Sequence, residues 1–365
     1  MGSDTGNVLL AAAERFCGAG AVLDVAPYGS GNVHGTYLVR RRGAADGRIL
    51  LQRVNTRVFP RPDRVMHNLR AVTEHLERRV RVGSAWQVPG VLLTRDGRDH
   101  WIDPAGGFWR ALRFVAGAHT IEIVRSTGEA EEVGRALGTF QSLLSDLPID
   151  RLADTLRGFH VTPLYLHRFD RVLARWGGRG SAELDSCLRF VEERRGCVTV
   201  LEDARCRGVL PLRPIHGDPK VNNVLFDDVT GRAVCLVDLD TVKPGLVHYD
   251  IGDCLRSACN PLGEETEHWP EVRFDPDLCR AVLAGYLGAA RSFLTEADRE
   301  HVYEAVHLIA FELGLRFLTD YLEGNVYFRV RSEEHNLVRA LVQFRLAESI
   351  EGQESVLRAL VRHLR

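Results

Sequence analysis

The sequence lacks several features that mark whole classes of protein. Its 365 residues contain no apolar run long enough to span a bilayer. Lysine and arginine number 47 against 49 aspartates and glutamates, so the basic excess typical of nucleic-acid binders is missing. The first residues carry Asp4 and Glu14 and no positive segment ahead of an apolar stretch, which favours an ordinary helix over a secretion signal. We therefore expect a cytoplasmic protein, monomeric or weakly dimeric, that binds neither nucleic acid nor membrane.

Cysteine is present but in no pattern typical of a site. The eight cysteines form no C-x-x-C pair, which argues against a structural zinc ion. Without a secretion signal, their even number does not indicate disulfides. We expect reduced thiols, several of them packed in the interior. They are Cys17, Cys187, Cys197, Cys206, Cys235, Cys254, Cys259 and Cys279.

The first third of the chain alternates strand and turn signals. A glycine-bearing turn, Gly29–Thr36, separates the first two apolar stretches. Pro62 opens a segment with apolar residues at helical spacing. Strands are predicted at residues 22–27, 36–40, 49–54, 90–94 and 109–115.

After residue 120 the pattern becomes mainly helical and is interrupted by a compact stretch of short strands at residues 221–242. The sequence therefore predicts an α+β fold of two lobes. Residues 1–115 would form a small antiparallel-sheet lobe that binds nucleotide, and residues 116–365 a larger, mainly helical lobe with the catalytic and substrate residues. A hinge is expected near residues 115–119, and a cleft beside it is a common place for a ligand.

The segment HGDPKVNN, residues 216–223, has the residue types of a catalytic loop. Pro219 disfavours helical geometry at Asp218, so this acid is expected on a loop, where a carboxylate can accept a proton from a substrate hydroxyl. The amide of Asn223 is a neutral oxygen ligand suited to Mg²⁺, and a second acid, Asp238, follows an apolar stretch downstream. This order of a base and two magnesium ligands predicts phosphoryl transfer.

These motifs resemble the aminoglycoside phosphotransferase family of small-molecule kinases, whose fold is protein-kinase-like. The resemblance rests on HGDPKVNNVLFD and CLVDLDTVKPGLVHYDIGD. PYGSGNVHGTYLV and RFLTDYLEGNVYF make it closest to the N-acetylhexosamine 1-kinases. It implies an ATP- and Mg²⁺-dependent kinase that phosphorylates a sugar hydroxyl, with the anomeric C1 hydroxyl of an N-acetylhexosamine or related sugar as the favoured acceptor.

The resemblance implies a role for each matching residue. Asp218 corresponds to the catalytic acid, and Asn223 and Asp238 correspond to the magnesium ligands. Asp250 corresponds to an acid that supports the catalytic loop, and we expect His216 to hold the same loop by packing and hydrogen bonding. Lys220 corresponds to a residue that contacts the sugar or the transferring phosphate, and Arg316 and Tyr327 correspond to substrate-side positions. His34, in a stretch where this chain departs from its relatives, is a further candidate for contact with the substrate.

The same resemblance implies a nucleotide site. Adenine is expected at the backbone of residues 114–119. The strand lysine usual in such kinases is missing, since the strand reads Gln52 and Arg53, and Arg53 can supply the charge. Backbone N–H groups of the glycine turn can face phosphates without Cβ interference. The residues expected there are Gly29, Gly31 and Asn32.

Two departures from the family pattern leave the acceptor open. Relatives read His-Ile-Asn-Asp-Thr where this chain has residues 32–36, and they carry aspartate in place of Asn325. The acceptor could instead be an aminoglycoside or another natural-product alcohol. The acidic stretch GEETEHWPE, residues 263–271, would suit a polycation, and it could equally be a solvated loop.

Each assignment has an ordinary alternative. Asp218 could be only a turn residue beside proline. Asp240 could hold a second metal ion or simply end a strand. Arg316 lies four residues from both Glu312 and Asp320, so an ion-pair ladder along one helix is the alternative to sugar binding.

A non-catalytic alternative also stays open, because the chain could be a nucleotide-binding pseudokinase. Its intact set of Asp218, Asn223 and Asp238 argues against that reading. A protein-kinase role is disfavoured because no A-P-E signature of an activation segment is present.

Overall fold

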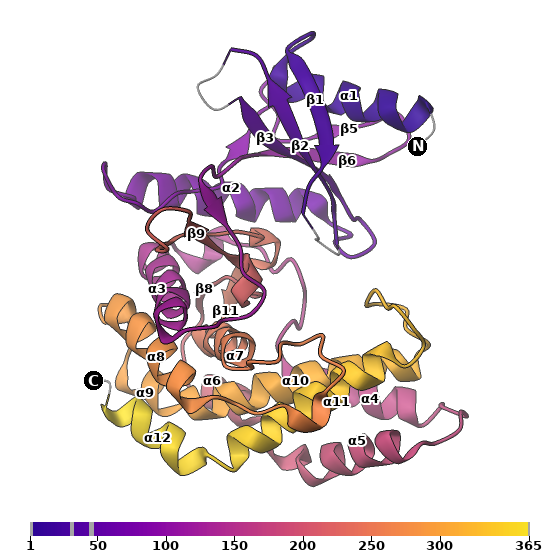
Figure 1. Cartoon of the computed structure of the whole chain (residues 1–365), viewed down its shortest axis with the longest axis vertical. Coiled ribbons are helices and arrows are strands. Elements are labelled where there is room, and N and C mark those ends of the chain that lie inside the picture. The colour runs from indigo at the N-terminus through magenta and orange to yellow at the C-terminus, as the bar shows by residue number, and fades with distance from the viewer. Residues whose placement is uncertain (1–2, 30–32, 44–46, 364–365) are drawn as a thin grey trace. The chain divides into compact units, whose positions relative to one another are not determined.

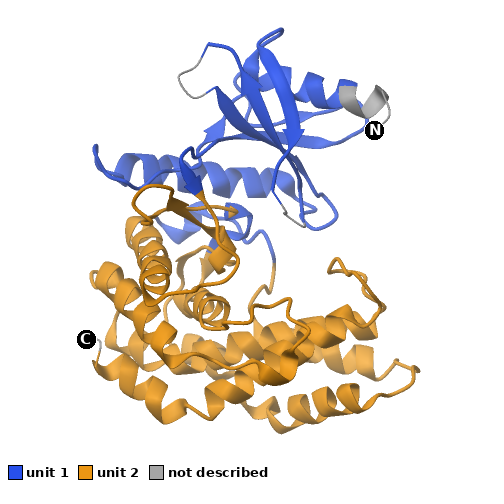
Figure 2. Ribbon diagram, viewed as in Figure 1, with its two compact units in different colours: residues 1–118, 146–156, 239–243 blue, residues 119–145, 157–238, 244–365 orange. Residues whose placement is uncertain are grey.

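The computed structural model describes residues 3–29, 33–43 and 47–363 and divides into two compact units (Figure 2). Strands dominate the first unit and helices the second, as the α+β prediction requires. The first unit also takes in two short segments from later in the chain. Unit 1 comprises residues 1–118, 146–156 and 239–243, and unit 2 comprises residues 119–145, 157–238 and 244–365.

Unit 1 is built on an antiparallel sheet with the strand order β1-β2-β3-β6-β4, and β5 pairs with β6 (Figure 1). The predicted strands are confirmed, although β4 is shorter than expected, and the two-residue strand β5 was not predicted. The strands are β1 (Val22–Pro27), β2 (Gly35–Arg41), β3 (Arg48–Val54), β4 (Val91–Leu92), β5 (Trp101–Ile102) and β6 (Phe108–Arg113).

Helix α1 (Ser3–Cys17) packs on one face of this sheet, with Phe16 in a buried cluster with Leu51 and Trp109. Side chains alternate along a strand, so Gln52 lies on the opposite face from Leu51. Gln52 is in register with Arg110 of β6, and both side chains therefore share the second face. This second face carries the polar residues discussed below.

Helix α2 (Pro62–Arg79) begins at the predicted proline and holds the two later segments of unit 1. The Asn68 side chain is buried and donates through Nδ2 to the backbone oxygens of Ala153 (2.7 Å) and Val242 (2.8 Å). The Ala153 N–H donates back to Asn68 Oδ1 at 2.8 Å. One buried amide thus fixes segments that lie far apart in the sequence.

Unit 2 is mainly helical, and its long helix α10 packs against α4, α7 and α11 (Figure 1). Its helices are α3 (Thr127–Leu144), α4 (Thr162–Leu173), α5 (Ala182–Glu193), α6 (Val200–Cys206), α7 (Val247–Ala258), α8 (Pro276–Ala290), α9 (Glu296–Glu300), α10 (Val302–Leu322), α11 (His335–Glu351) and α12 (Glu354–His363). Within the described residues, no helix is both long and apolar enough to cross a membrane.

Short strands and 3₁₀ helices connect these elements. Strands β10, β9 and β7 form one small sheet and β11 pairs with β8. The strands are β7 (Ala118–His119), β8 (Arg213–Ile215), β9 (Val224–Asp227), β10 (Ala233–Leu236) and β11 (Lys243–Gly245). The 3₁₀ helices are η1 (Ile149–Arg151), η2 (Arg195–Cys197), η3 (Val221–Asn223), η4 (Leu239–Thr241) and η5 (Trp269–Glu271).

Helices α3 and α8 approach each other closely because glycines face the contact. A Cβ on Gly134 would lie 1.9 Å from the Val282 backbone oxygen, and one on Gly285 would lie 2.0 Å from the Glu131 backbone oxygen. Neither position has room for a side chain. This contact places α3, which carries Gln141, against the rest of unit 2.

The cysteines are free thiols, as predicted. Cys206 is exposed and Cys197 partly exposed, while the other six are buried. Burial raises the pKa of the Cys235 thiol, which disfavours its thiolate form.

Candidate active site

The segment 216–223 is a loop between β8 and β9, and a buried acid holds its start. Asp250, in the first turn of α7, accepts hydrogen bonds from the backbone N–H groups of His216 and Gly217, each at 2.8 Å. Gly217 has φ +87°, a conformation that favours glycine. Burial raises the pKa of Asp250. The loop therefore owes its shape to backbone hydrogen bonds made by one carboxylate.

Gln141 completes this support and was not recognised from the sequence. Its Nε2 donates to Asp250 at 2.9 Å, and its Oε1 accepts the hydroxyl of Tyr286 at 2.7 Å. All three side chains are buried. A glutamine within an apolar helical stretch was the available signal.

His216 is fully buried and links the loop to the segment that precedes Asp238. The backbone N–H of Asp218 donates to its Nδ1 at 3.3 Å, so the ring hydrogen is on Nε2 and is donated to the Val237 oxygen at 3.0 Å. Its ring packs edge-on against Phe140. These contacts join the loop to the next segment, and the supporting role of His216 stays a prediction.

A second histidine, His160, supports the loop from another side. Its ring nitrogens face two acceptors, the Gly217 oxygen at 2.7 Å and Glu312 Oε1 at 2.9 Å. Both nitrogens must donate, so the ring is cationic. Burial lowers the pKa of His160, but the charge and hydrogen bond of Glu312, the charge of Asp253 and the hydrogen bond to the Gly217 oxygen together raise it by more. A buried glutamate inside the apolar stretch of α10 was the sequence signal for this pair.

Asp218 lies at the centre of the loop with two polar neighbours. Lys220 Nζ contacts Asp218 Oδ2 at 2.9 Å, and Asn223 Nδ2 donates to the Asp218 backbone oxygen at 2.7 Å. Burial lowers the pKa of Lys220. The charge and hydrogen bond of Asp218, with the charges of other nearby acids, raise the pKa by more, so the lysine stays charged. An acid that is partly exposed and paired with a cation can accept a proton from a hydroxyl brought to it.

The residues expected to hold magnesium fit a hard cation. Because Asn223 Nδ2 is committed to the Asp218 backbone, its Oδ1 lies on the other side of the amide. The Val237 N–H donates to the Asn223 backbone oxygen at 2.9 Å, which brings Asp238 beside Asn223. An amide oxygen and a carboxylate are oxygen donors of the kind Mg²⁺ prefers.

Arg316 of α10 lies among aromatic rings. Its guanidinium carbon is 5.1 Å from the Phe159 ring centre, 5.2 Å from that of Tyr165 and 5.6 Å from that of Phe328. Burial lowers the pKa of Arg316, but the charges of Tyr165, Tyr327, Glu312 and Asp218 together raise it above the usual value. Arg316 therefore stays a cation inside its aromatic cluster.

The ion-pair ladder considered for Arg316 is replaced by other bonds. Glu312 accepts from His160 and from the hydroxyl of Thr162 at 2.7 Å. Asp320 accepts three backbone N–H groups just after α10, including that of Tyr327 at 2.7 Å. Both carboxylates therefore organise local structure.

Tyr327 and Asn325 lie in the loop after α10. The Tyr327 side chain is 48% exposed and packs edge-on against Phe328, a neighbour of Arg316. Asn325 has φ +61°, a left-handed conformation that asparagine tolerates better than most residues. The asparagine that departs from the family pattern at this position therefore suits the backbone of the loop.

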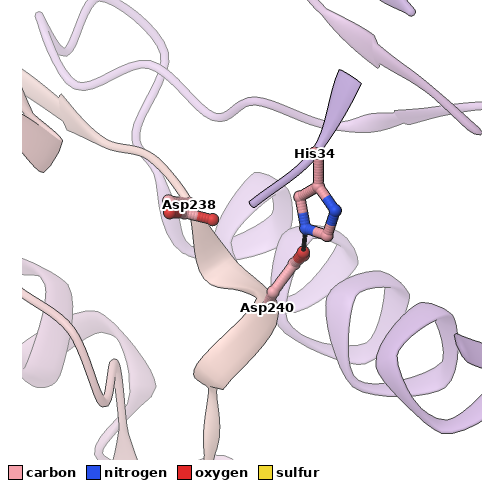
Figure 3. Close-up of side chains that lie close together, drawn as sticks. All are labelled: His34, Asp238 and Asp240. Atoms are coloured by element: carbon pink, nitrogen blue, oxygen red, sulfur yellow. Dashed lines mark hydrogen bonds and ion pairs between the residues drawn. The ribbon is translucent and has the colours of Figure 1, made fainter. Parts of the chain in front are cut away.

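In unit 1, the turn before β2 contains three residues assigned to the nucleotide. Gly29 has φ +75°, as a tight turn requires, whereas Gly31 and Asn32 lie outside the described residues. His34 accepts the Asn55 backbone N–H at Nδ1 (3.0 Å), and its Nε2 bonds to Asp240 at 2.5 Å (Figure 3). Both ring nitrogens of His34 are thus occupied, and its role toward the acceptor stays a prediction.

Asp240 forms a buried ion pair that neither sequence alternative anticipated. Its two oxygens accept from Arg110 at 2.6 and 2.8 Å, and both side chains are 2% exposed. Burial raises the pKa of Asp240, but the charges and hydrogen bonds of Arg110 and His34 together lower it by more, so the pKa lies well below the usual value. Arg110 was missed because it stands between apolar residues of β6 with no recognisable motif.

Arg53 lies on the other face of β3 from Gln52. It is exposed, and its guanidinium carbon is 5.9 Å from the Trp109 ring centre. Gln52 instead contacts Thr36 and accepts from Arg110 at 2.9 Å. A contact between Arg53 and nucleotide phosphates stays a prediction.

Comparison with known proteins identifies the family. Residues 24–294 match the model described as the phosphotransferase enzyme family. The chain belongs to this family. The predicted α+β, kinase-like fold is thereby confirmed, with its antiparallel-sheet N-terminal part and helical C-terminal part.

Several solved structures share this fold at low sequence identity. The aminoglycoside phosphotransferase of Alicyclobacillus acidocaldarius matches with a TM-score of 0.64 at 15% identity, over 97% of this chain and 96% of that one. The choline kinase of Cryptosporidium parvum Iowa II matches with a TM-score of 0.64 at 16% identity, over 99% of both chains. The GDP complex of aminoglycoside 2′-phosphotransferase-IIIa matches with a TM-score of 0.56 at 13% identity, over 97% of this chain and 100% of that one.

Proposed function

We propose that this phosphotransferase is an ATP-dependent small-molecule kinase that phosphorylates a sugar hydroxyl. The favoured acceptor is the anomeric C1 hydroxyl of an N-acetylhexosamine or related sugar. The observation that carries the proposal is the loop in which Asp218 is paired with Lys220 and bonded to Asn223. A base, a cation and an amide held together in this way are the parts that phosphoryl transfer needs.

In the proposed reaction, Asp218 accepts the proton of the acceptor hydroxyl as its oxygen attacks the γ-phosphorus. The bond from that phosphorus to the ADP oxygen breaks, and the phosphoryl group passes to the sugar. Lys220 neutralises part of the negative charge on the phosphoryl oxygens. Mg²⁺ held by Asn223 and Asp238 would neutralise the nucleotide phosphates. Positioning and charge stabilisation supply most of the rate.

The surroundings of Arg316 favour a neutral or anionic acceptor over a cationic one. Aromatic clusters often bind ammonium groups by cation–π attraction. Here the rings of Phe159, Tyr165 and Phe328 already surround a guanidinium. This guanidinium makes no hydrogen bond or ion pair with any of the described residues. Its N–H groups can therefore donate to hydroxyl or carbonyl oxygens of a sugar.

The acidic stretch within residues 263–271 gives little support to a polycationic acceptor. Glu264 is paired with Arg256 at 2.8 Å, and Glu265 accepts from Arg339 at 2.8 Å. Both carboxylates are thus engaged by arginines of the chain, although Glu264 shares Arg256 with Asp253. Similar structures include an aminoglycoside phosphotransferase and a choline kinase, so a cationic acceptor is the alternative that the assay must include.

For the nucleotide, we propose ATP bound at the glycine turn around Gly29, with adenine at the backbone of residues 114–119 and Arg53 near the phosphates. The GDP complex of one structural relative supports a nucleotide as phosphoryl donor. A non-catalytic nucleotide binder is the remaining alternative. It would bind ATP without consuming it.

The test is ADP release from Mg-ATP with N-acetylhexosamines, other free sugars, aminoglycosides and choline. Asp218→Asn should lower turnover by about 10³-fold, because a positioned base contributes on the order of 10²–10⁴-fold. Asp277→Asn, an exposed acid in the same unit, is the matched control and should keep full activity. Turnover of cationic acceptors alone would refute the sugar assignment, and ATP binding without ADP release would refute the kinase.

A further inference from the structure

We propose that Arg110, Asp240 and His34 form a positioning network that fixes the turn at Asp238 and thereby sets the magnesium affinity of the enzyme. The proposal rests on the proposed function, because it assumes that Asp238 is a magnesium ligand. Asp240 is on this account a positioning residue, not a second ligand. The network lies within unit 1, and Asp238 is the residue immediately before its segment 239–243.

Arg110 and Asp240 form a buried, bidentate ion pair. Arg110 uses both terminal nitrogens on the carboxylate at 2.6 and 2.8 Å, and its Nε donates to Gln52 Oε1 at 2.9 Å. A bidentate arginine–carboxylate pair fixes orientation as well as distance. Because Arg110 is on β6, in the interior of the sheet order, the pair ties η4 to a rigid element.

Two hydrogen bonds fix the orientation of the His34 ring. The Asn55 N–H donates to Nδ1, so that nitrogen carries no hydrogen, and Nε2–H donates to Asp240. A backbone group thus selects the tautomer that the carboxylate needs. Figure 3 shows the His34 ring directed at Asp240, with Asp238 two residues earlier in the chain. His34 and Arg110 together satisfy the Asp240 carboxylate from two elements.

The segment of residues 239–243 is also anchored at its C-terminal end. Asn68 of α2 donates to the Val242 oxygen at 2.8 Å. Lys243 Nζ contacts Asp154 at 3.1 Å and the Leu156 oxygen at 3.1 Å. With Asp240 and Lys243 both held, residues 239–243 have little freedom to shift.

Asp238 has φ +64°, a left-handed conformation that few non-glycine residues adopt. Such a conformation persists only where the neighbouring residues on both sides impose it. On the upstream side, Val237 bonds to His216 and to Asn223. On the downstream side, the first side-chain anchor is Asp240. Loss of that anchor lets the turn relax, and the Asp238 carboxylate then loses its fixed direction.

The experiment measures Mn²⁺ binding in the presence of ADP by electron paramagnetic resonance, with Mg²⁺-dependent turnover as the second readout. Asp240→Asn should weaken Mn²⁺ binding by about 10–100-fold, as loss of groups that orient metal ligands does. Raising Mg²⁺ should restore its turnover, whereas Asp238→Asn, which alters a ligand, should not be restored. The control is Arg113→Gln, because Arg113 is on the same strand as Arg110 but forms only an exposed ion pair, with Glu77 at 3.2 Å. This variant should bind Mn²⁺ like the wild-type protein.

Unchanged Mn²⁺ affinity in a folded Asp240→Asn variant would overturn the positioning role, and so would turnover that added Mg²⁺ does not restore. If Asp240→Asn does not fold, His34→Gln tests the same network, and an affinity equal to wild type would overturn the proposal. Failure of the wild-type protein to bind Mn²⁺ with ADP would refute the proposed function instead. The two failures are therefore distinguishable.

Discussion

The buried carboxylate of Asp250 accepts the backbone N–H of Gly217 at 2.8 Å, one residue before the proposed base. Gly217 has φ +87°, a conformation open to glycine, and the hydrogen bond selects it in the folded protein. The position of the base is thus set by backbone contacts from a different element, α7.

Asp250→Asn should both destabilise the protein and impair turnover. An amide offers one acceptor oxygen where the carboxylate accepts from His216, Gly217 and Gln141. We expect a loss of about 3 kcal/mol in the free energy of unfolding, together with a fall in kcat of about 10²-fold because the base is misplaced.

Urea unfolding and the ADP-release assay measure these two effects. The matched control is Asp275→Asn, because Asp275 accepts two backbone N–H groups as the N-cap of α8 and asparagine caps equally well. The control should leave both quantities unchanged. An Asp250→Asn variant as stable as that control would contradict the proposed support of the loop.

Arg316→Met should change which acceptors bind. The substitution removes the cation from the aromatic cluster and keeps an apolar side chain in place. A hydrogen bond from a charged group contributes about 1.5–3 kcal/mol, so KM for the sugar should rise about 10–100-fold with a smaller effect on kcat. The vacated rings should also admit an ammonium acceptor such as choline more readily.

Steady-state kinetics on both acceptor classes checks this prediction. Arg168→Met is the control, since Arg168 pairs with Glu323 at a partly exposed position and lies outside the aromatic cluster. Equal KM values for the sugar in the wild-type and Arg316→Met proteins would show that Arg316 does not contact the acceptor.

The α3–α8 contact predicts opposite effects for chemically identical substitutions. Gly134→Ala and Gly285→Ala place a Cβ within 1.9 and 2.0 Å of backbone oxygens, so each should destabilise the protein by about 3 kcal/mol or more. Gly288→Ala, on the exposed side of α8, meets nothing within 4 Å and should stabilise it by about 0.5–1 kcal/mol. Thermal unfolding of the three variants decides the matter. Equal effects at Gly134 and Gly288 would contradict the close packing.

His307 predicts a pH dependence of stability. Burial lowers the pKa of His307, but hydrogen bonds to Cys197 and Glu351 outweigh it and raise the pKa from 6.5 to about 9. A raised folded-state pKa means that the stabilisation is full below pH 6.5 and is lost as the pH rises through 9. Its size is up to about 3 kcal/mol.

Urea unfolding of the wild-type and His307→Gln proteins at pH 6 and pH 9.5 tests this sign. The variant should be less stable at pH 6, and the difference should shrink at pH 9.5. A difference that is the same at both pH values would mean that His307 is not protonated in the folded protein.

Local chemistry explains what could be predicted from the sequence. Asp218 and Asn223 lie five residues apart in one loop, so their spacing alone indicates shared chemistry. The strands of unit 1 carry period-two patterns between turns, and Pro62 marks the start of α2. Each of these signals depends on neighbours in the chain.

The groups that the sequence did not reveal act over long sequence distances. Asp240 pairs with Arg110, which is 130 residues away, and His160 pairs with Glu312, which is 152 residues away. Neither pair has a recognisable sequence motif. A charged residue in an apolar stretch indicates that a buried partner exists, but it does not indicate which residue the partner is. Gln141 was missed for the same reason. Only the folded chain shows which residues meet.

The most direct test of the central claim is phosphorus NMR of the product formed from Mg-ATP and an N-acetylhexosamine. With the wild-type protein, ADP should form together with a new sugar phosphate resonance coupled to the anomeric proton, and neither should form with Asp218→Asn. Near-normal product formation by Asp218→Asn would contradict the mechanism. A phosphate on another hydroxyl, or no sugar phosphate while a different alcohol is phosphorylated, would contradict the assignment of the acceptor.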